Sequence, residues 1–138
     1  MQTRQAQLTD FDELYAMWQQ VCDQLYPVAE EKARFVAMMQ LNPDLCLVVT
    51  DEVGAIIGSI LGAFDGRNGS IHRLIIASQH QQKGLGKMLI SELEKLLKAR
   101  GIKKFTAQIH AQNTIVAPFY EKLGFSEMNY VKTFYKDL

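Results

Sequence analysis

The stretch Gln81–Lys87, which reads Gln-Gln-Lys-Gly-Leu-Gly-Lys, joins an apolar run to a strongly helical one. The preceding run, Leu74–Ile76, is typical of a buried strand, and the apolar spacing that follows predicts an amphipathic helix. The first N–H groups of a helix lack partners within it, and the helix dipole places partial positive charge there. Gly84 and Gly86 allow a ligand to approach the backbone closely, and the two lysines add formal charge. The sequence therefore predicts a site for a phosphorylated ligand at this turn.

Two well-known phosphate loops do not fit the spacing of this turn. A Walker loop needs Ser or Thr after its Gly-Lys pair, but Met88 stands there, and Gln81 occupies the position of the earlier glycine. A dinucleotide-binding loop needs a third glycine three residues after Gly86, where this chain has Leu89. The pattern that remains is Gln-x-x-Gly-x-Gly between a strand and a helix.

A second segment, Asn113–Phe125, combines an Asn, a helical stretch with a Phe-Tyr pair, and a terminal Gly-Phe. The two segments, in this order and with helix and strand patterns between them, resemble the GNAT acyl-CoA-dependent N-acetyltransferases. The resemblance extends over the whole chain, so residues 1–138 are expected to form a single domain. It implies an acyltransferase that uses acetyl-CoA as cosubstrate, bound by its pyrophosphate at the glycine loop.

Composition excludes several other classes of protein. The chain of 138 residues carries 15 basic and 15 acidic side chains, and this balance argues against nucleic acid as a partner. No apolar run approaches the ~20 residues that span a bilayer, so no membrane partner is expected. Cys22 and Cys46 lack a Cys-x-x-Cys spacing and fit a reducing compartment, with the cytoplasm as the expected location. The three histidines have no ligand-like spacing, so no metal is expected.

Periodicity and turn residues predict alternating strands and helices. The expected order is a strand at 3–7, helices from about 10 to 25 and at 29–41, a strand at 45–50, a long strand through Ile56 and Leu61, a strand at 70–77, a helix from 85 to 100, a strand at 104–110, a short helix that ends at Gly124, and strands at 126–130 and 131–135. The pattern alone indicates a mixed α/β (α+β) domain. The resemblance adds a mostly antiparallel central sheet, splayed parallel strands at the CoA site and about four flanking helices. Pro118 fits its helix only if it falls in the first turn.

The resemblance also assigns cofactor contacts. The pantetheine amides are expected to pair with the backbone of Leu74, Ile75 and Ile76, in a form of strand addition. Asn113 matches a residue that contacts CoA, although an Asn there is equally natural as a helix N-cap. The pyrophosphate contacts are expected from Gln81, Gln82, Lys83, Gly84, Leu85, Gly86 and Lys87.

Two residues are candidates for catalysis. Tyr120 matches the family tyrosine that donates a proton or hydrogen bond to the departing thiolate; its alternative is an aromatic residue of the core. His72, with a pKa suited to a general base, alternates onto the same face as Ser70, Leu74 and Ile76; a water-mediated base is the alternative. A strand N–H near Ile76 is expected to stabilise the developing oxyanion.

The leading hypothesis is acetyl transfer to a primary amine, by direct attack within a ternary complex. The acceptor is a small-molecule or peptide amine that the sequence does not identify. A catalytically silent acyl-CoA-binding regulatory module is the alternative, and a general nucleotide-binding protein is a third interpretation. The C-terminal strands or the sheet edge offer surfaces for a homodimer.

Overall fold

The computed structural model describes the whole chain, Met1–Leu138, which divides into two compact units, Met1–Gln108 and Ile109–Leu138. The first unit holds a five-stranded sheet and three helices, and the second holds the short helix α4 (Val116–Lys122). None of the helices is both long enough and apolar enough to cross a membrane.

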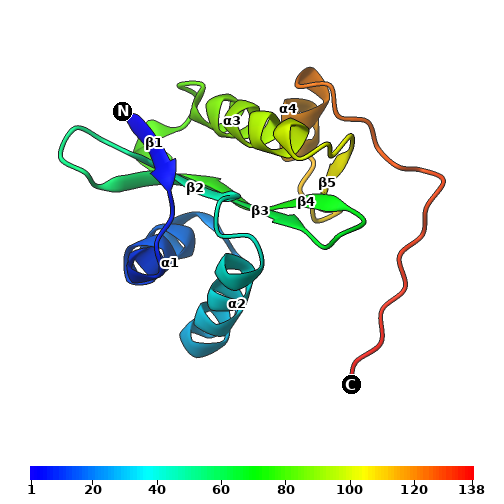
Figure 1. Ribbon diagram of the computed structural model, residues 1–138, viewed down its shortest axis with the longest axis horizontal. Helices are drawn as coiled ribbons and strands as arrows, with labels where there is room; N and C mark the ends of the chain where they lie inside the picture. The colour runs from blue at the N-terminus through cyan, green and yellow to red at the C-terminus, as the bar shows by residue number, and fades with distance from the viewer. The chain divides into compact units, whose positions relative to one another are not determined.

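The sheet of the first unit has the order β1-β2-β3-β4-β5, antiparallel throughout except for the last pair, which is parallel. Its strands are β1 (Gln2–Gln5), β2 (Cys46–Thr50), β3 (Ile56–Phe64), β4 (Gly69–Ile76) and β5 (Phe105–Ala107). Helices α1 (Phe11–Val21) and α2 (Val28–Leu41) cover one face of the sheet, and α3 (Leu85–Ala99) covers the other (Figure 1). The expected mixed, mostly antiparallel sheet with a parallel pair and about four helices is therefore confirmed.

Each face of the sheet has its own apolar core. Under α1 and α2, the rings of Trp18 and Phe35 meet nearly edge to face, with centroids 6.4 Å apart. Against α3, glycine lets the helix pack directly on β3, because a Cβ on Gly62 would lie 2.6 Å from Cδ1 of Leu93. The central strands β2 and β3 are thus buried on both faces for nearly their whole length, which explains why their residues are mostly apolar.

Strand β4 contains a bulge that the alternation of its sequence does not reveal. Ser59 pairs with Ile75 and Leu61 with His72, so β4 carries one residue more than β3 across this interval. Arg73 lies in the bulge with φ of +49°, a left-handed conformation that few non-glycine residues adopt. Because of this extra residue, the side chains after Arg73 point to the faces opposite to those that strict alternation from His72 would predict.

The C-terminal segment differs from the sequence prediction. The strands expected at 126–130 and 131–135 do not form, and no strand follows α4. Phe134 and Tyr135 are 88% and 90% exposed. Alternating apolar residues favour a strand, but a strand needs a neighbouring ladder to satisfy its backbone, and this segment has none. The strand expected at 104–110 is shorter, Phe105–Ala107, because only these residues pair with β4.

Candidate active site

The parallel strands β4 and β5 are joined only at one end. Gly69–Ile71 pair with Phe105–Ala107, and beyond this point His72–Ile76 have no strand beside them on the β5 side. This confirms the expected splay of the parallel pair. It leaves an open edge of β4 that runs directly toward the glycine loop.

The open edge offers backbone groups from alternate residues of β4. The N–H of Ala77 donates to the carbonyl of Ile57 on β3 at 2.9 Å. Because successive backbone groups of a strand point to opposite sides, those of Ile75 also face β3, and those of Leu74 and Ile76 face the open edge. Of the three residues expected to pair with pantetheine, Leu74 and Ile76 have backbone groups at the open edge, whereas those of Ile75 face β3.

The loop after β4 leads into an uncapped helix. Gln81 donates from its side-chain amide to the carbonyl of Ile76 at 3.0 Å, so it tethers the loop to the open edge of β4. Gln82 and Gly84 both adopt positive φ, at 62° and 80°, and Gly84 is the N-cap residue of α3. No side chain caps the first turn of α3, which leaves its N–H groups available to a ligand.

The charge around this helix end is positive. Lys83 and Lys87 are exposed and form no ion pair, and the first turn of α3 contains no acidic residue. Leu85 is buried and anchors the first turn on the sheet. Free N–H groups, the dipole of a 15-residue helix and two unpaired ammonium groups together form a site suited to a phosphate or diphosphate.

His72 lies beside Ser70 on the neighbouring part of β4. Its Nε2 and the Ser70 Oγ are 2.9 Å apart, within hydrogen-bond distance. Burial lowers the pKa of His72 below its ordinary value, and the nearby Arg73 guanidinium lowers it further. At neutral pH the imidazole is therefore largely uncharged and able to accept a proton.

The expected alignment of His72 with Leu74 and Ile76 on one face is wrong, because the bulge at Arg73 intervenes. Ile76 pairs with Gly58, whose α-carbon faces Leu89 of α3. His72 instead pairs with Leu61, which shares a face with Ser59, the hydrogen-bond partner of Trp18 on α1. His72 therefore belongs to the α1 and α2 face of the sheet.

In the second unit, Tyr120 lies on α4 between two other aromatic rings. The centroids of Phe119 and Phe125 are each 5.2 Å from that of Tyr120, both in edge-to-face orientation. Burial raises the pKa of the Tyr120 phenol above its ordinary value. Pro118 is the third residue of α4, so it falls in the first turn, as the sequence requires.

Asn113 precedes α4 without capping it. The N-cap position belongs to Ile115, so the alternative role of Asn113 as a helix cap is wrong. Its backbone N–H donates to the carbonyl of His110 at 2.8 Å, and its side chain is exposed. The amide side chain is thus free to contact a ligand.

Sequence reasoning missed a group of contacts around the bulge, made by Trp18, Glu31, Ser59 and Arg73. The only local signal is a charged residue within the apolar run of β4. Its partners come from positions 14 to 55 residues away, and sequence spacing cannot identify such pairings. No group of three His, Cys, Asp or Glu side chains is arranged to hold a metal ion.

Comparison with known proteins agrees with this geometry. The model of the acetyltransferase (GNAT) family matches residues 7–125. The chain belongs to the GNAT acetyltransferase family. An acetyltransferase of Yersinia enterocolitica is 35% identical over 125 residues, which cover 91% of this chain and 87% of the relative.

Solved GNAT structures share the fold. Ard1 from Thermoplasma volcanium superposes with a TM-score of 0.81 at 20% identity, over 91% of this chain and 82% of Ard1. A NatB acetyltransferase complex bound to CoA and MES gives a TM-score of 0.76 at 21% identity, over 91% of this chain and 77% of the matched chain. These structures show that the chain has the GNAT fold, and the family model and the Yersinia relative show that it is an acyltransferase.

Proposed function

We propose that this protein transfers an acetyl group from acetyl-CoA to a primary amine, by direct attack within a ternary complex. The observation that carries the proposal is the open edge of β4 leading into the uncapped, glycine-started helix α3. Coenzyme A has the two features that such a site recognises, an amide-containing arm and a diphosphate.

The residues of the first unit fit this cosubstrate. The backbone of Leu74 and Ile76 is directed to hydrogen-bond the pantetheine amides as an added strand. The N–H groups from Gln82 to Lys87 are available for the diphosphate, because no side chain caps α3 and Gly84 adopts positive φ at its start. Gln81 must release the Ile76 carbonyl if that carbonyl is to accept a bond from the cosubstrate.

The amine must lose a proton before it attacks. For an amine with a pKa of about 10.4, reaching the neutral form at pH 7 costs about 4.6 kcal/mol. We assign His72 as the base, directly or through a water molecule, because its lowered pKa leaves it uncharged at neutral pH and the residue, although partly desolvated, still keeps contact with solvent. As the amine attacks, the Ile76 N–H is the donor for the negative charge that develops on the acyl oxygen.

The thiolate of coenzyme A leaves as the new amide forms. We assign the Tyr120 hydroxyl as its donor, since this phenol makes no hydrogen bond within the protein and its raised pKa keeps it protonated. Proton transfer from a phenol of pKa about 10 to a thiolate of about 8.5 is uphill by about 2 kcal/mol, so Tyr120 acts mainly as a hydrogen-bond donor. Asn113 is proposed as a further CoA contact.

Release of free thiol from acetyl-CoA, measured across a panel of amines, tests the activity. The native chain should release thiol with at least one amine, and Tyr120→Phe should lower kcat by about a hundredfold with little change in CoA affinity. CoA binding without turnover of any amine would instead support a silent acyl-CoA-binding module. Absence of CoA binding would overturn the proposal.

A further inference from the structure

Buried polar contacts tie the bulge of β4 to helix α1. The Ser59 Oγ accepts a hydrogen bond from Trp18 Nε1 at 3.0 Å and donates to the carbonyl of Arg73 at 2.8 Å. Trp18 and Ser59 are both completely buried. The serine therefore supplies a hydrogen bond to the carbonyl of Arg73 within the bulge, where the register of β3 and β4 shifts.

A buried ion pair ties the same bulge to helix α2. The Glu31 Oε1 accepts a hydrogen bond from the Arg73 guanidinium, and a weaker one from the backbone N–H of Tyr26 at 3.3 Å. The Glu31 side chain is only 4% exposed and that of Arg73 only 25%. The guanidinium carbon also lies 5.7 Å from the centroid of the Trp18 ring. The charge of Glu31 is thus held almost out of water by one cationic partner.

The side-chain contacts explain a backbone conformation that arginine does not favour. Left-handed φ costs an ordinary residue free energy that must be offset by surrounding contacts. At Arg73 those contacts are the Ser59 hydroxyl on its carbonyl and the Glu31 carboxylate on its guanidinium. The bulge in turn sets which backbone groups of Leu74 and Ile76 face the open edge.

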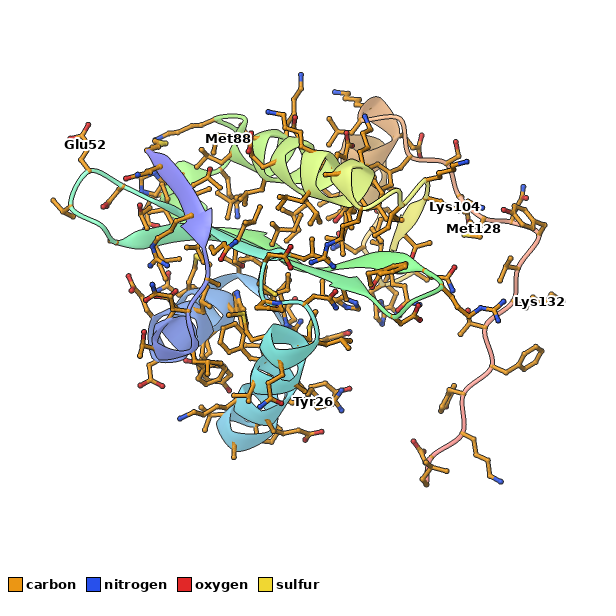
Figure 2. All side chains as sticks on the ribbon, in the orientation of Figure 1. Tyr26, Glu52, Met88, Lys104, Met128 and Lys132 are labelled. Carbon is orange, nitrogen blue, oxygen red and sulfur yellow. The ribbon has the colours of Figure 1, made fainter.

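We propose that Glu31 is a positioning residue for the cosubstrate: by its ion pair with Arg73 it holds the left-handed turn that directs Leu74 and Ile76 toward the open edge of β4. The inference rests on the proposed binding of CoA at that edge. It makes CoA affinity depend on the placement of α2, a helix on the face of the sheet opposite to α3. Tyr26, whose backbone Glu31 also contacts, lies beside α2 on that face (Figure 2).

The first experiment compares Glu31→Gln with the full-length native chain by calorimetry with CoA. Glutamine keeps the volume and can still accept hydrogen bonds, but it lacks the charge that holds the guanidinium. We expect CoA binding to weaken by about tenfold. The matched control is Glu30→Gln, which breaks the exposed pair with Arg34 on the same helix and should leave CoA affinity unchanged.

A double-mutant cycle separates positioning from general loss of stability. Asparagine adopts left-handed φ readily, so Arg73→Asn keeps the turn without help from Glu31. Glu31→Gln should therefore have no further effect on CoA affinity in the Arg73→Asn background. Since that double variant no longer buries an unpaired carboxylate, it should also fold at least as stably as Arg73→Asn alone.

Trp18 is the sole tryptophan, so its fluorescence reports the same contacts without cosubstrate. Glu31→Gln should shift its emission, and Glu30→Gln should not. Equal CoA affinity of the native and Glu31→Gln chains would overturn the inference while leaving the proposed function intact, as would an equal loss in both backgrounds of the cycle. If the native chain bound no CoA, the proposed function itself would fail and the inference with it.

Discussion

At the scale of single residues, Gly84 is the position where backbone conformation and ligand binding coincide. Its φ is +80°, and a Cβ added there would meet no atom within 4 Å, so Gly84→Ala acts through backbone strain alone. We expect a loss of about 1 kcal/mol in unfolding free energy and about fivefold weaker CoA binding. Gly54→Ala is the control, because Gly54 has φ of +86° and equal space but lies in the turn before β3. Denaturant unfolding and calorimetry give both quantities; equal CoA losses in the two variants would contradict the prediction.

Arg73 gives a second test at this scale. Arg73→Val and Arg73→Asn both remove the guanidinium and its pair with Glu31, but valine disfavours the left-handed region strongly. We expect Arg73→Val to be less stable than Arg73→Asn by about 1–2 kcal/mol. It should also bind CoA more weakly. Thermal melts and CoA titrations of the two variants at one salt concentration measure these differences. Equal stability and equal CoA affinity would show that the left-handed conformation at position 73 affects neither.

At the scale of elements, the start of α3 combines the helix dipole with two free lysines. Lys83→Ala and Lys87→Ala should each weaken CoA binding by about threefold at low salt, and the effect should shrink as salt screens the charges. Lys95 lies on the same helix but is exposed and paired with Glu92, so Lys95→Ala should bind CoA normally. Titrations at low and high ionic strength provide the measurement. An equal loss for Lys95→Ala would mean that overall charge, rather than the helix end, attracts the ligand.

Elements differ in how far the sequence determines them. Helix α3 begins at Leu85 as its apolar spacing predicts, and Gly101 after it has the positive φ of a helix-terminating glycine. The sequence pattern that predicts α3 is local, because one apolar face indicates the helix and one glycine indicates where it ends. The bulge at Arg73 depends on Ser59 and Glu31, which are distant in sequence, so no window of residues could reveal it. The strand expected at 131–135 does not form. Apolar alternation within a segment cannot show whether another strand is available to pair with it.

At the scale of the whole molecule, the sequence predicted the loop that we propose binds the cosubstrate, but not the geometry of the strand beside it. The loop from Gln81 to Lys87 could be predicted from glycines and charge, because the N-terminal end of a helix attracts anions whatever the fold. Which strand groups are available was not predictable, since the bulge redirects the backbone after Arg73. The same bulge puts the side chains of His72, the proposed base, and Ile76, the proposed oxyanion donor, on opposite faces of the sheet. This placement depends on the pairing of β3 with β4, which the sequence alone does not show.

The pH dependence of the reaction tests that arrangement as a whole. Burial lowers the pKa of His72 below its usual value near 6.5. A base must be unprotonated, so activity that depends on His72 is present above the lowered pKa and lost as the pH falls through it. We expect kcat/KM of the native chain to fall on this acid limb, below about pH 6.5. In His72→Gln, kcat/KM should be about a hundredfold lower at pH 7.5 and should lack the limb. Stopped assays with one amine across pH 5 to 8 at constant ionic strength measure the two profiles. An acid limb that persists in His72→Gln would assign the titration to the amine or to a base other than His72.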